Sequence, residues 1–536
     1  MKKIYTIFLA VACGTSSVLC TSCMDEIVPN DTMTTETLAS SASATEALLW
    51  AMPAFLNNYH TYASYENDWG YGSMMHVRDV MTDDMSVQDG GYDWYVYWRN
   101  NKNQGGDNAY IKMVWTYYTK FLLTANNLIS AVNPESATDT QLGYLAAGYA
   151  FRAMIYLDLG RMYEFLPNDG TSATNTSGNN VTNLTVPIVR ETTSLEDARK
   201  NPRATHAELA AFILEDLDKA EQYMQYFDRT SKTLPDLACV YGLKARLYMW
   251  NEDYSNAAIY ARKAIDTNLY VPMSESDWLD PTTGFNQLSD DAWMWGSQMT
   301  EEDDVVQSYY RNWTSWMSNE CVGFTYYGAV PMIGASFYNR IDDTDWRKLA
   351  WLAPEGSALE GQNSFCEPDL MAGMPEYASL KFRPNEGNGQ DLLVAAASAY
   401  PLMRIEEMYF IEAEAKAHSN ASEGKQLLVD FMKTYRYPTY ICAVSAQDEV
   451  IDEIVFQKRI ELWGEGLNFF DVKRLNMPVT RSYDGTNFDA STLFNTTTRP
   501  AWMNFCISDL EKENNPGIEG YENPNPSDCY TLQTGN

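Results

Sequence analysis

The sequence has few positive charges. Lysine and arginine together number 38 against 72 aspartates and glutamates, which gives a formal net charge of −34 and a pI near 4.4. A chain with this balance repels the phosphate backbone of nucleic acids and the anionic head groups of lipids. Nucleic acid is therefore not an expected partner.

Histidine is scarce, and the common motifs of catalysis are missing. The four histidines lie far apart, and neither a Gly-x-Ser-x-Gly motif nor a glycine-rich phosphate loop occurs. These absences argue against a metalloenzyme, a serine hydrolase and a nucleotide-dependent enzyme, so we predict no catalytic residues and no cofactor. A structural calcium ion stays an alternative, because loop carboxylates bind calcium well. The acidic runs that could supply such ligands are 83–84, 301–304 and 342–345.

Beyond its N-terminus the chain has no run long and apolar enough to span a membrane. The N-terminus is typical of a secretion signal, with two lysines before the apolar stretch 4–19. The sequence Leu-Cys-Thr-Ser-Cys that ends at Cys23 then resembles a bacterial lipobox. We predict a signal peptide over 1–22, lipidation of Cys23 and a tether over 23–42. An ordinary cleaved secretion signal is the alternative.

Cysteine is sparse in the predicted mature chain. Of nine cysteines, three belong to the leader and its acceptor position, and the other six form no Cys-x-x-Cys pair. Export permits disulfides, and Cys506 and Cys529 are the nearest candidates for one. A metal site is not indicated.

The sequence does contain strongly periodic helical segments. Capping boxes at Ser43-x-x-Glu46, Thr138-x-x-Gln141 and Thr205-x-x-Glu208 predict helix starts. Within 241–264, aromatic and small residues are spaced as in a tetratricopeptide helical hairpin. We therefore predict a mostly α fold with several packed hairpins over 43–271. Periodicity also predicts helices at 108–131, 403–417 and 423–434, the last two within a C-terminal helical region over 401–536.

Two segments, 59–101 and 272–400, are rich in aromatic residues and poor in helical periodicity. Long irregular segments inside a folded chain are usually functional. Trp and Tyr rings pack on the flat apolar faces of sugars, while neighbouring polar groups bind the hydroxyls. We therefore predict an oligosaccharide site in these segments. The candidate ligand-binding residues are Trp94, Trp98, Trp293, Trp295, Trp313, Trp316 and Tyr310, with Asp93, Arg99, Asn100, Asn101, Arg311 and Asn312 as polar partners.

Two features of these segments have alternatives. For each single tryptophan, burial in the core is the competing interpretation, because large aromatic residues dominate cores. The alternation around Trp94 also fits a short strand, with half of its rings pointing inward.

The stretch 457–474 combines charges and aromatic rings around two glycines, Gly464 and Gly466. The glycines predict that one helix ends there, and Asn468 is a suitable N-cap for the next. Charges beside so much aromatic surface must be paired. A catalytic charge cluster is one interpretation; we favour a structural corner, because structural ion-pair networks resemble active sites.

Several motifs in order resemble the SusD/RagB family of outer-membrane nutrient-binding lipoproteins. One departure is Ser508-Asp509, where that family usually has Ile-Pro. The segments that carry the resemblance, which spans nearly the whole mature chain, are 23–31, 150–159, 404–415, 457–474 and 514–516.

The resemblance implies a SusD-like fold, with tetratricopeptide-like hairpins and an irregular, loop-rich half that binds ligand. It also implies an outer-membrane, cell-surface lipoprotein that captures glycan without catalysis and acts as the lid of a SusC-like TonB-dependent transporter. The family's ligand residues are not tied to its motifs, so none is carried over. A peptide-binding member and, more distantly, a glycoside hydrolase are the alternatives.

Overall fold

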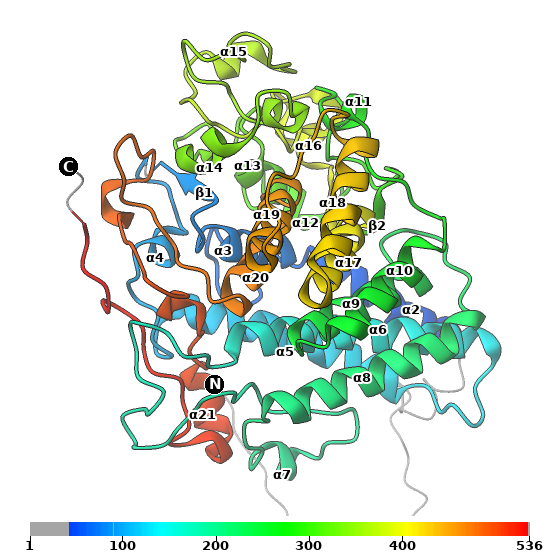
Figure 1. The fold of residues 1–536 in the computed structure, drawn as a ribbon. Helices are drawn as coiled ribbons and strands as arrows, with labels where there is room; N and C mark the ends of the chain where they lie inside the picture. Colours follow the sequence, from blue (N-terminus) through cyan, green and yellow to red (C-terminus); the bar gives the residue numbers. More distant parts are fainter. Residues whose placement is uncertain (1–41, 89, 534–536) are drawn as a thin grey trace, which may run out of the picture.

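The computed structural model describes residues 42–88 and 90–533. The predicted signal peptide, Cys23 and most of the predicted tether lie outside these ranges. Long helices of the N-terminal half lie side by side in the lower half of Figure 1. The strands, most of the short helices and most helices of the C-terminal region lie above them. The fold is mostly helical, as predicted. Among the described residues, no helix has both the length and the apolar character needed to cross a membrane.

The N-terminal half is built from long helices, most of which begin at a side-chain N-cap. At the predicted capping box, Gln141 N donates to Thr138 Oγ1 at 3.3 Å, and Thr138 N donates to Gln141 Oε1 at 3.0 Å. The box that begins at Thr205 is also present. The helices are α2 (Ala42–Leu56), α5 (Ala109–Ser130), α6 (Asp139–Tyr163), α8 (His206–Tyr223), α9 (Leu237–Trp250) and α10 (Tyr254–Ile265).

The helices α9 and α10 form the predicted tetratricopeptide-like hairpin. Ala257, Ala261 and Ala264 are fully buried, so the two helices approach closely through small side chains. The outer helix α10 also packs against α17 (Ile405–Ser419) of the C-terminal region. The hairpin therefore joins the two helical parts of the chain.

The irregular segment pairs strands that are far apart in sequence. In the described part of the chain, β1 (Met85–Val87) pairs with β3 (Pro331–Ile333), and β2 (Trp293–Gln298) pairs with β4 (Ala399–Arg404), both antiparallel. The short helices nearby are α3 (Tyr71–Asp79), α4 (Val96–Arg99), α11 (Glu275–Trp278), α12 (Asp304–Gln307), α13 (Trp313–Met317), α14 (Ala335–Arg340), α15 (Pro368–Met371) and α16 (Leu392–Ala396). The short helix α7 (Leu195–Ala198) belongs to the helical half and lies beside α8 (Figure 1).

The alternative of a short strand around Trp94 is wrong. Tyr95 N donates to Asp93 Oδ1 at 2.8 Å, which starts a turn, and α4 follows at once. An ion pair between Asp93 and Arg99 joins the two ends of this turn and helix. A side chain that bonds the backbone locally competes with strand pairing.

The C-terminal region holds the predicted corner. Gly464 and Gly466 have φ of 75° and 69°, where a side chain would be strained. The predicted N-cap is wrong by one residue: Asn468 begins α20, and its amide donates to Asp84 Oδ2 and to Arg459 O, both at 3.0 Å. The remaining helices are α18 (Ala421–Tyr435), α19 (Gln447–Glu461), α20 (Asn468–Arg474) and α21 (Asp509–Asn514).

Cys506 and Cys529, the nearest candidates for a disulfide, are not bonded to each other. All six cysteines of the described chain are free. Cys506 is buried, with its thiol 3.7 Å from the carbonyl oxygens of Asn523 and Pro524. The Cys529 sulfur instead accepts from Asn101 Nδ2 at 3.6 Å.

Candidate functional site

Most of the predicted tryptophans lie in the core and not on the surface. Trp295 is representative: its ring meets Phe151 edge-on at 4.8 Å, and its indole N–H donates to Thr233 O at 3.1 Å. These rings do not face a ligand site. They fill the core, which was the alternative interpretation. The candidate tryptophans that are at most 2 % exposed are Trp98, Trp293, Trp295, Trp313 and Trp316.

The predicted polar partners are also engaged within the protein. Buried Arg99 pairs with Asp93 and donates to Val87 O at 2.9 Å. Asn312 is buried as the N-cap of α13, where it accepts from Ser315 N at 3.0 Å. Asn101 is buried against Cys529. These contacts use the groups that were expected to bind sugar hydroxyls.

An exposed group of tyrosines joins the two predicted aromatic segments. We call Tyr92, Tyr310, Tyr326 and Tyr327 the tyrosine surface. The ring centroid of Tyr327 lies 6.2 Å from those of Tyr92 and Tyr310, and 5.4 Å from that of Tyr326. Tyr92, Tyr326 and Tyr327 are 56, 49 and 46 % exposed, and Tyr310 is half-buried.

The tyrosine surface rests on the buried core. Tyr310 meets Phe324 edge-on at 6.0 Å, and Phe324 stacks on Trp316 at 4.2 Å. Trp316 thus supports the exposed rings from below, although it does not face solvent itself. The tyrosine surface therefore packs on core rings on its inner side and is exposed to solvent on its outer side.

Two glycines bring the loops of the tyrosine surface together. A Cβ placed on Gly90 would lie 2.7 Å from the Gly328 Cα, closer than real atoms approach. Gly328 also has φ of 112°, which side chains rarely adopt. Backbone-to-backbone contact between these loops sets Tyr92 beside Tyr327.

A second, half-buried aromatic group consists of Tyr65, Trp94 and Tyr110. Tyr65 lies 6.2 Å from Trp94 and 6.0 Å from Tyr110, measured between ring centroids. An ion pair of 2.7 Å between Glu66 and Arg311, each about a quarter exposed, links this group to the loop of Tyr310. Of the tryptophans predicted to bind ligand, Trp94 is partly exposed and the others are buried.

The Tyr310 hydroxyl stays protonated at neutral pH. Burial, and then the neighbouring hydroxyl of Tyr327, raise the pKa of Tyr310 above its usual value. A neutral phenol donates one hydrogen bond and accepts others. The surface therefore combines apolar ring faces with uncharged hydrogen-bonding groups.

The sequence candidates omitted Tyr92, Tyr326 and Tyr327, although all three lie in the predicted segments. The available signal was the pairing of tyrosine with glycine, in Gly90-Gly91-Tyr92 and Tyr326-Tyr327-Gly328. Glycine favours tight loops, whose side chains tend to be exposed. Tryptophan content did not identify the exposed rings, because most of the candidate tryptophans lie in the core.

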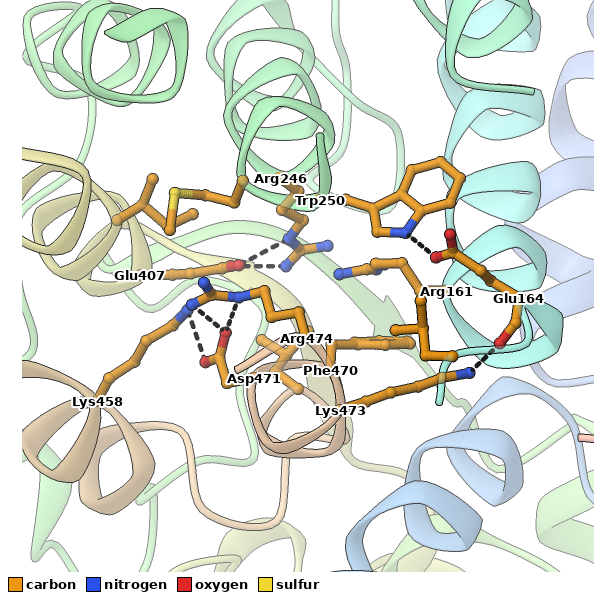
Figure 2. Close-up of a pocket in the computed structure, with 14 residues that line it drawn as sticks. Arg161, Glu164, Arg246, Trp250, Glu407, Lys458, Phe470, Asp471, Lys473 and Arg474 are labelled. Carbon is orange, nitrogen blue, oxygen red and sulfur yellow. Dashed lines mark hydrogen bonds and ion pairs between the residues drawn. The ribbon is translucent and has the colours of Figure 1, made fainter. Parts of the chain in front are cut away.

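The corner at 457–474 contributes to a buried ion-pair network. Six of its seven charged side chains have ion-pair partners, as expected, and the seventh, Lys473, donates to the carbonyl oxygen of Met162 and to that of Glu164 (Figure 2). Burial opposes ionisation of Glu461, but the charges of Arg436, Arg404 and Arg347 outweigh burial and hold its pKa well below the usual range. The network contains four cations and four carboxylates. They are Arg347, Lys381, Arg404 and Arg436 with Asp345, Glu406, Glu461 and Glu465.

Several of the acidic residues proposed as calcium ligands have protein partners. Asp83 and Asp84 pair with Arg459, and Asp343 pairs with Lys348 at 2.7 Å. Within 42–88 and 90–533, no group of three or more His, Cys, Asp or Glu side chains is arranged to hold a metal ion.

Comparisons with known proteins agree with this architecture. The model of the SusD family matches residues 332–530, and a model described as "Starch-binding associating with outer membrane" matches residues 35–249. SusD-like protein P2 of Formosa agariphila is 22 % identical over 455 residues, which cover 78 % of this chain and 82 % of that protein. SusD-like protein P38 of the same organism is also 22 % identical, over 425 residues, 71 % of this chain and 75 % of that protein.

Solved structures share the fold. A SusD-like carbohydrate binding protein from Bacteroides vulgatus superposes with a TM-score of 0.69 at 21 % identity, covering 90 % of this chain and 98 % of that one. A SusD superfamily protein from Bacteroides thetaiotaomicron gives 0.67 at 19 % identity, with coverage of 90 and 99 %. The fold and the two family models together define a SusD-like protein. The chain belongs to the SusD/RagB family.

Proposed function

We propose that the protein captures an oligosaccharide on the tyrosine surface and passes it to a SusC-like TonB-dependent transporter, for which it acts as a lid. In this proposal a lipid on Cys23 holds the protein at the outer face of the outer membrane. Binding involves no catalysis. Because the proposed ligand site lies on the irregular half, the helical half is free to contact the transporter.

The observation that supports this proposal is the exposure of the tyrosine surface. Three of its rings are about half exposed and touch one another above Phe324 and Trp316. Contiguous aromatic rings of this kind are unusual on a soluble surface and mark a binding site. Sugars fit such rings because their C–H faces are apolar and their edges carry hydroxyls.

Trp94 extends the proposed site toward the half-buried aromatic group. The Glu66–Arg311 ion pair lies between the two groups and can bind hydroxyls of the same chain of sugars. The ligand we propose is therefore long enough to contact both groups, as an oligosaccharide of several units is.

The test is a glycan screen by isothermal calorimetry on the purified protein, followed by Tyr327→Ala. We expect this change to weaken binding about 10- to 30-fold, or ~1.4–2 kcal/mol, as loss of a central aromatic contact does. The matched control is Tyr521→Ala, because Tyr521 is 45 % exposed and belongs to the C-terminal segment that packs beside residues 175–179. It should bind with unchanged affinity.

Other outcomes would replace the proposal. Affinity for peptides and for no glycan would identify a peptide-binding member of the family. Turnover of an oligosaccharide, lost on changing a single carboxylate, would identify a glycoside hydrolase. Equal loss of affinity in Tyr327→Ala and Tyr521→Ala would place the ligand elsewhere.

A further inference from the structure

Trp50, on α2, is the most exposed tryptophan of the chain. It is 39 % exposed, whereas the other tryptophans are buried or half-buried. An indole ring left in water forgoes the large free-energy gain of burial. A single exposed apolar residue is ordinary, but one that lines a concave surface is a candidate ligand contact.

Trp50 lines an open groove between the C-terminal part of α2 and residues 298–304. We call it the Trp50 groove. It has a volume of about 560 Å³, within the range of ~300–1,000 Å³ that is typical of ligand sites. Its lining includes Trp50, Phe55, Tyr59, Gln298, Asp303 and Asp304.

The α2 side of the Trp50 groove is apolar and packs on the core. Phe55 stacks on Phe121 of α5 with ring centroids 5.0 Å apart, and its centroid lies 5.4 Å from that of Tyr117. Both of these α5 rings are fully buried. This wall of the groove is therefore formed before any ligand binds, which lowers the cost of binding.

The opposite side of the Trp50 groove carries carboxylates without cationic partners. Asp303 Oδ2 accepts from Thr300 N at 2.7 Å, and Asp304 is exposed. Among the residues that the structure describes, neither aspartate forms an ion pair, and the segment 264–310 contains no lysine or arginine. Both carboxylates can therefore accept hydrogen bonds from a ligand.

An indole ring opposite two carboxylates fits a neutral sugar. The apolar C–H face of a sugar ring packs on the indole, and carboxylates accept hydrogen bonds from hydroxyls that are stronger than those between neutral groups. Anionic sugars, acidic peptides and anionic lipid surfaces are repelled by the same carboxylates and by the net charge of −34. A basic peptide is the other occupant that the charge would accept.

A short loop joins the Trp50 groove to the half-buried aromatic group of the proposed sugar site. At the groove, Asn57 Nδ2 donates to Gln298 O at 2.7 Å. At the other end of the loop, Glu66 pairs with Arg311 at 2.7 Å. The loop 57–66 extends over at most about 30 Å, so one oligosaccharide of several units can reach both sites.

Aromatic side chains occur along this loop. Tyr59 lines the groove, Tyr62 and Tyr65 lie 6.3 Å apart, and Tyr65 lies 6.2 Å from Trp94, measured between ring centroids. Buried Asp68 fixes the loop, because its Oδ2 accepts from the backbone of Tyr62 and of the next residue at 2.8 and 3.1 Å. Half-buried rings thus lead from the groove to Trp94, which favours a sugar chain over a basic peptide.

We infer that the Trp50 groove binds a second part of the glycan that the tyrosine surface captures, with a neutral sugar ring on Trp50 and its hydroxyls on Asp303 and Asp304. The inference rests on the proposed function and narrows it. The ligand is an uncharged oligosaccharide long enough to reach both sites, and the carboxylates disfavour uronic acids and sulfated sugars at this position.

Calorimetry with a short and a long form of the best neutral glycan tests the inference. Trp50→Ala should weaken binding of the long form at least about tenfold and leave a disaccharide within roughly twofold. Tyr327→Ala should weaken both forms. The matched control is Tyr226→Ala, because Tyr226 is 38 % exposed and does not line the groove; it should change neither.

The carboxylates are tested with a glycan of the same length that carries uronic acids. The unaltered protein should bind this acidic glycan less tightly than the neutral one, and Asp304→Asn should narrow the difference. Because Asp304 is exposed, this variant keeps the fold and supplies the readout if Trp50→Ala does not fold. An undiminished preference for the neutral glycan in Asp304→Asn would contradict the inference.

The outcomes separate this inference from the proposed function. Unchanged affinity of folded Trp50→Ala for both forms, with loss in Tyr327→Ala, would overturn the inference and leave the proposed function. Loss in Trp50→Ala alone would keep the groove as a sugar site and remove the tyrosine surface. A basic peptide that binds the unaltered protein and not Trp50→Ala, with glycan affinity unchanged in that variant, would make the groove a protein-docking site and overturn the inference.

A crystal structure with the long glycan gives a direct readout on the unaltered protein. A sugar ring should lie against Trp50. Ordered glycan on the tyrosine surface with none in the Trp50 groove would contradict the inference while supporting the proposed function.

Discussion

The corner at 457–474 and the tyrosine surface both combine aromatic rings with nearby charged groups. They differ in how far the rings are buried and how the charges are paired. At the corner, rings such as Trp463 are fully buried, and Glu461 belongs to a network with equal numbers of cations and carboxylates. On the tyrosine surface, three rings are about half exposed, and the nearest ion pair is partly open to solvent. The comparison indicates that the corner holds the fold together, while the tyrosine surface is available to a ligand.

The largest expected effect comes from breaking the corner. Arg459 is buried and pairs with Asp83 and Asp84. Arg459→Ala leaves these carboxylates without their partner, and removing one member of a buried pair costs about 3–5 kcal/mol. Urea unfolding should show this loss, while calorimetry on the protein that still folds should give wild-type glycan affinity. The control is Lys200→Ala at an exposed pair with Glu196, for which we expect a change of at most ~0.5 kcal/mol.

A similar loss of stability is expected for a buried tryptophan of the predicted site. Trp295→Ala removes a fully buried ring and the hydrogen bond to Thr233, and such truncations cost about 3–5 kcal/mol. Chemical unfolding measures this. If instead the variant keeps its stability and loses glycan binding, Trp295 belongs to the ligand site and the comparison fails.

A smaller and different effect is expected at the glycines between the loops. Gly90→Ala places a Cβ 2.7 Å from the Gly328 Cα, so the loops must separate and Tyr92 must move from Tyr327. We expect a loss of glycan affinity with little change in the unfolding midpoint. Gly373→Ala is the matched control, because no atom lies within 4 Å of its Cβ position. Unchanged affinity in Gly90→Ala would show that the spacing of the loops is not part of the site.

The smallest expected effect is a pH dependence on the helical side. Burial lowers the pKa of His206, but its hydrogen bond to Glu164 and the charge of that carboxylate outweigh burial and raise the pKa. Because the folded pKa lies above the unfolded value, near 6.5, this contribution is fully present below about pH 6.5 and is lost as pH rises through the folded pKa.

Unfolding free energies measured on both sides of this window should therefore fall with rising pH, and His206→Gln should flatten the slope. Glycan affinity should stay constant over the same window, since the pKa of Tyr310 lies above its usual value. An affinity that follows the His206 titration would connect the two regions that we treat as separate.

Much of the helical architecture could be predicted from the sequence, because local signals determine it. The box at Thr138, the small-residue spacing of α9 and α10, and the glycines of the corner each act within a few residues. The position of the N-cap at the corner could not be predicted, because Asn468 bonds Asp84, which is far away in the sequence. The free state of Cys506 likewise depends on residues 523–524.

The candidate site was predicted only at the level of segments. Both aromatic segments contribute to the tyrosine surface, through Tyr92 and through Tyr310, Tyr326 and Tyr327. Which rings are exposed depends on packing between the segments, as the stack of Phe324 on Trp316 shows. Composition cannot separate a ring that faces ligand from one that supports it.

The most direct test of the central claim is a calorimetric titration of the double variant Tyr326→Ala, Tyr327→Ala with the best glycan from the screen, alongside its melting temperature. Both rings are about half exposed, so the melting temperature should stay within about 2 °C of the unaltered protein. Our account predicts that glycan binding weakens by more than about 30-fold, ~2 kcal/mol. Unchanged affinity in a normally folded double variant would contradict it.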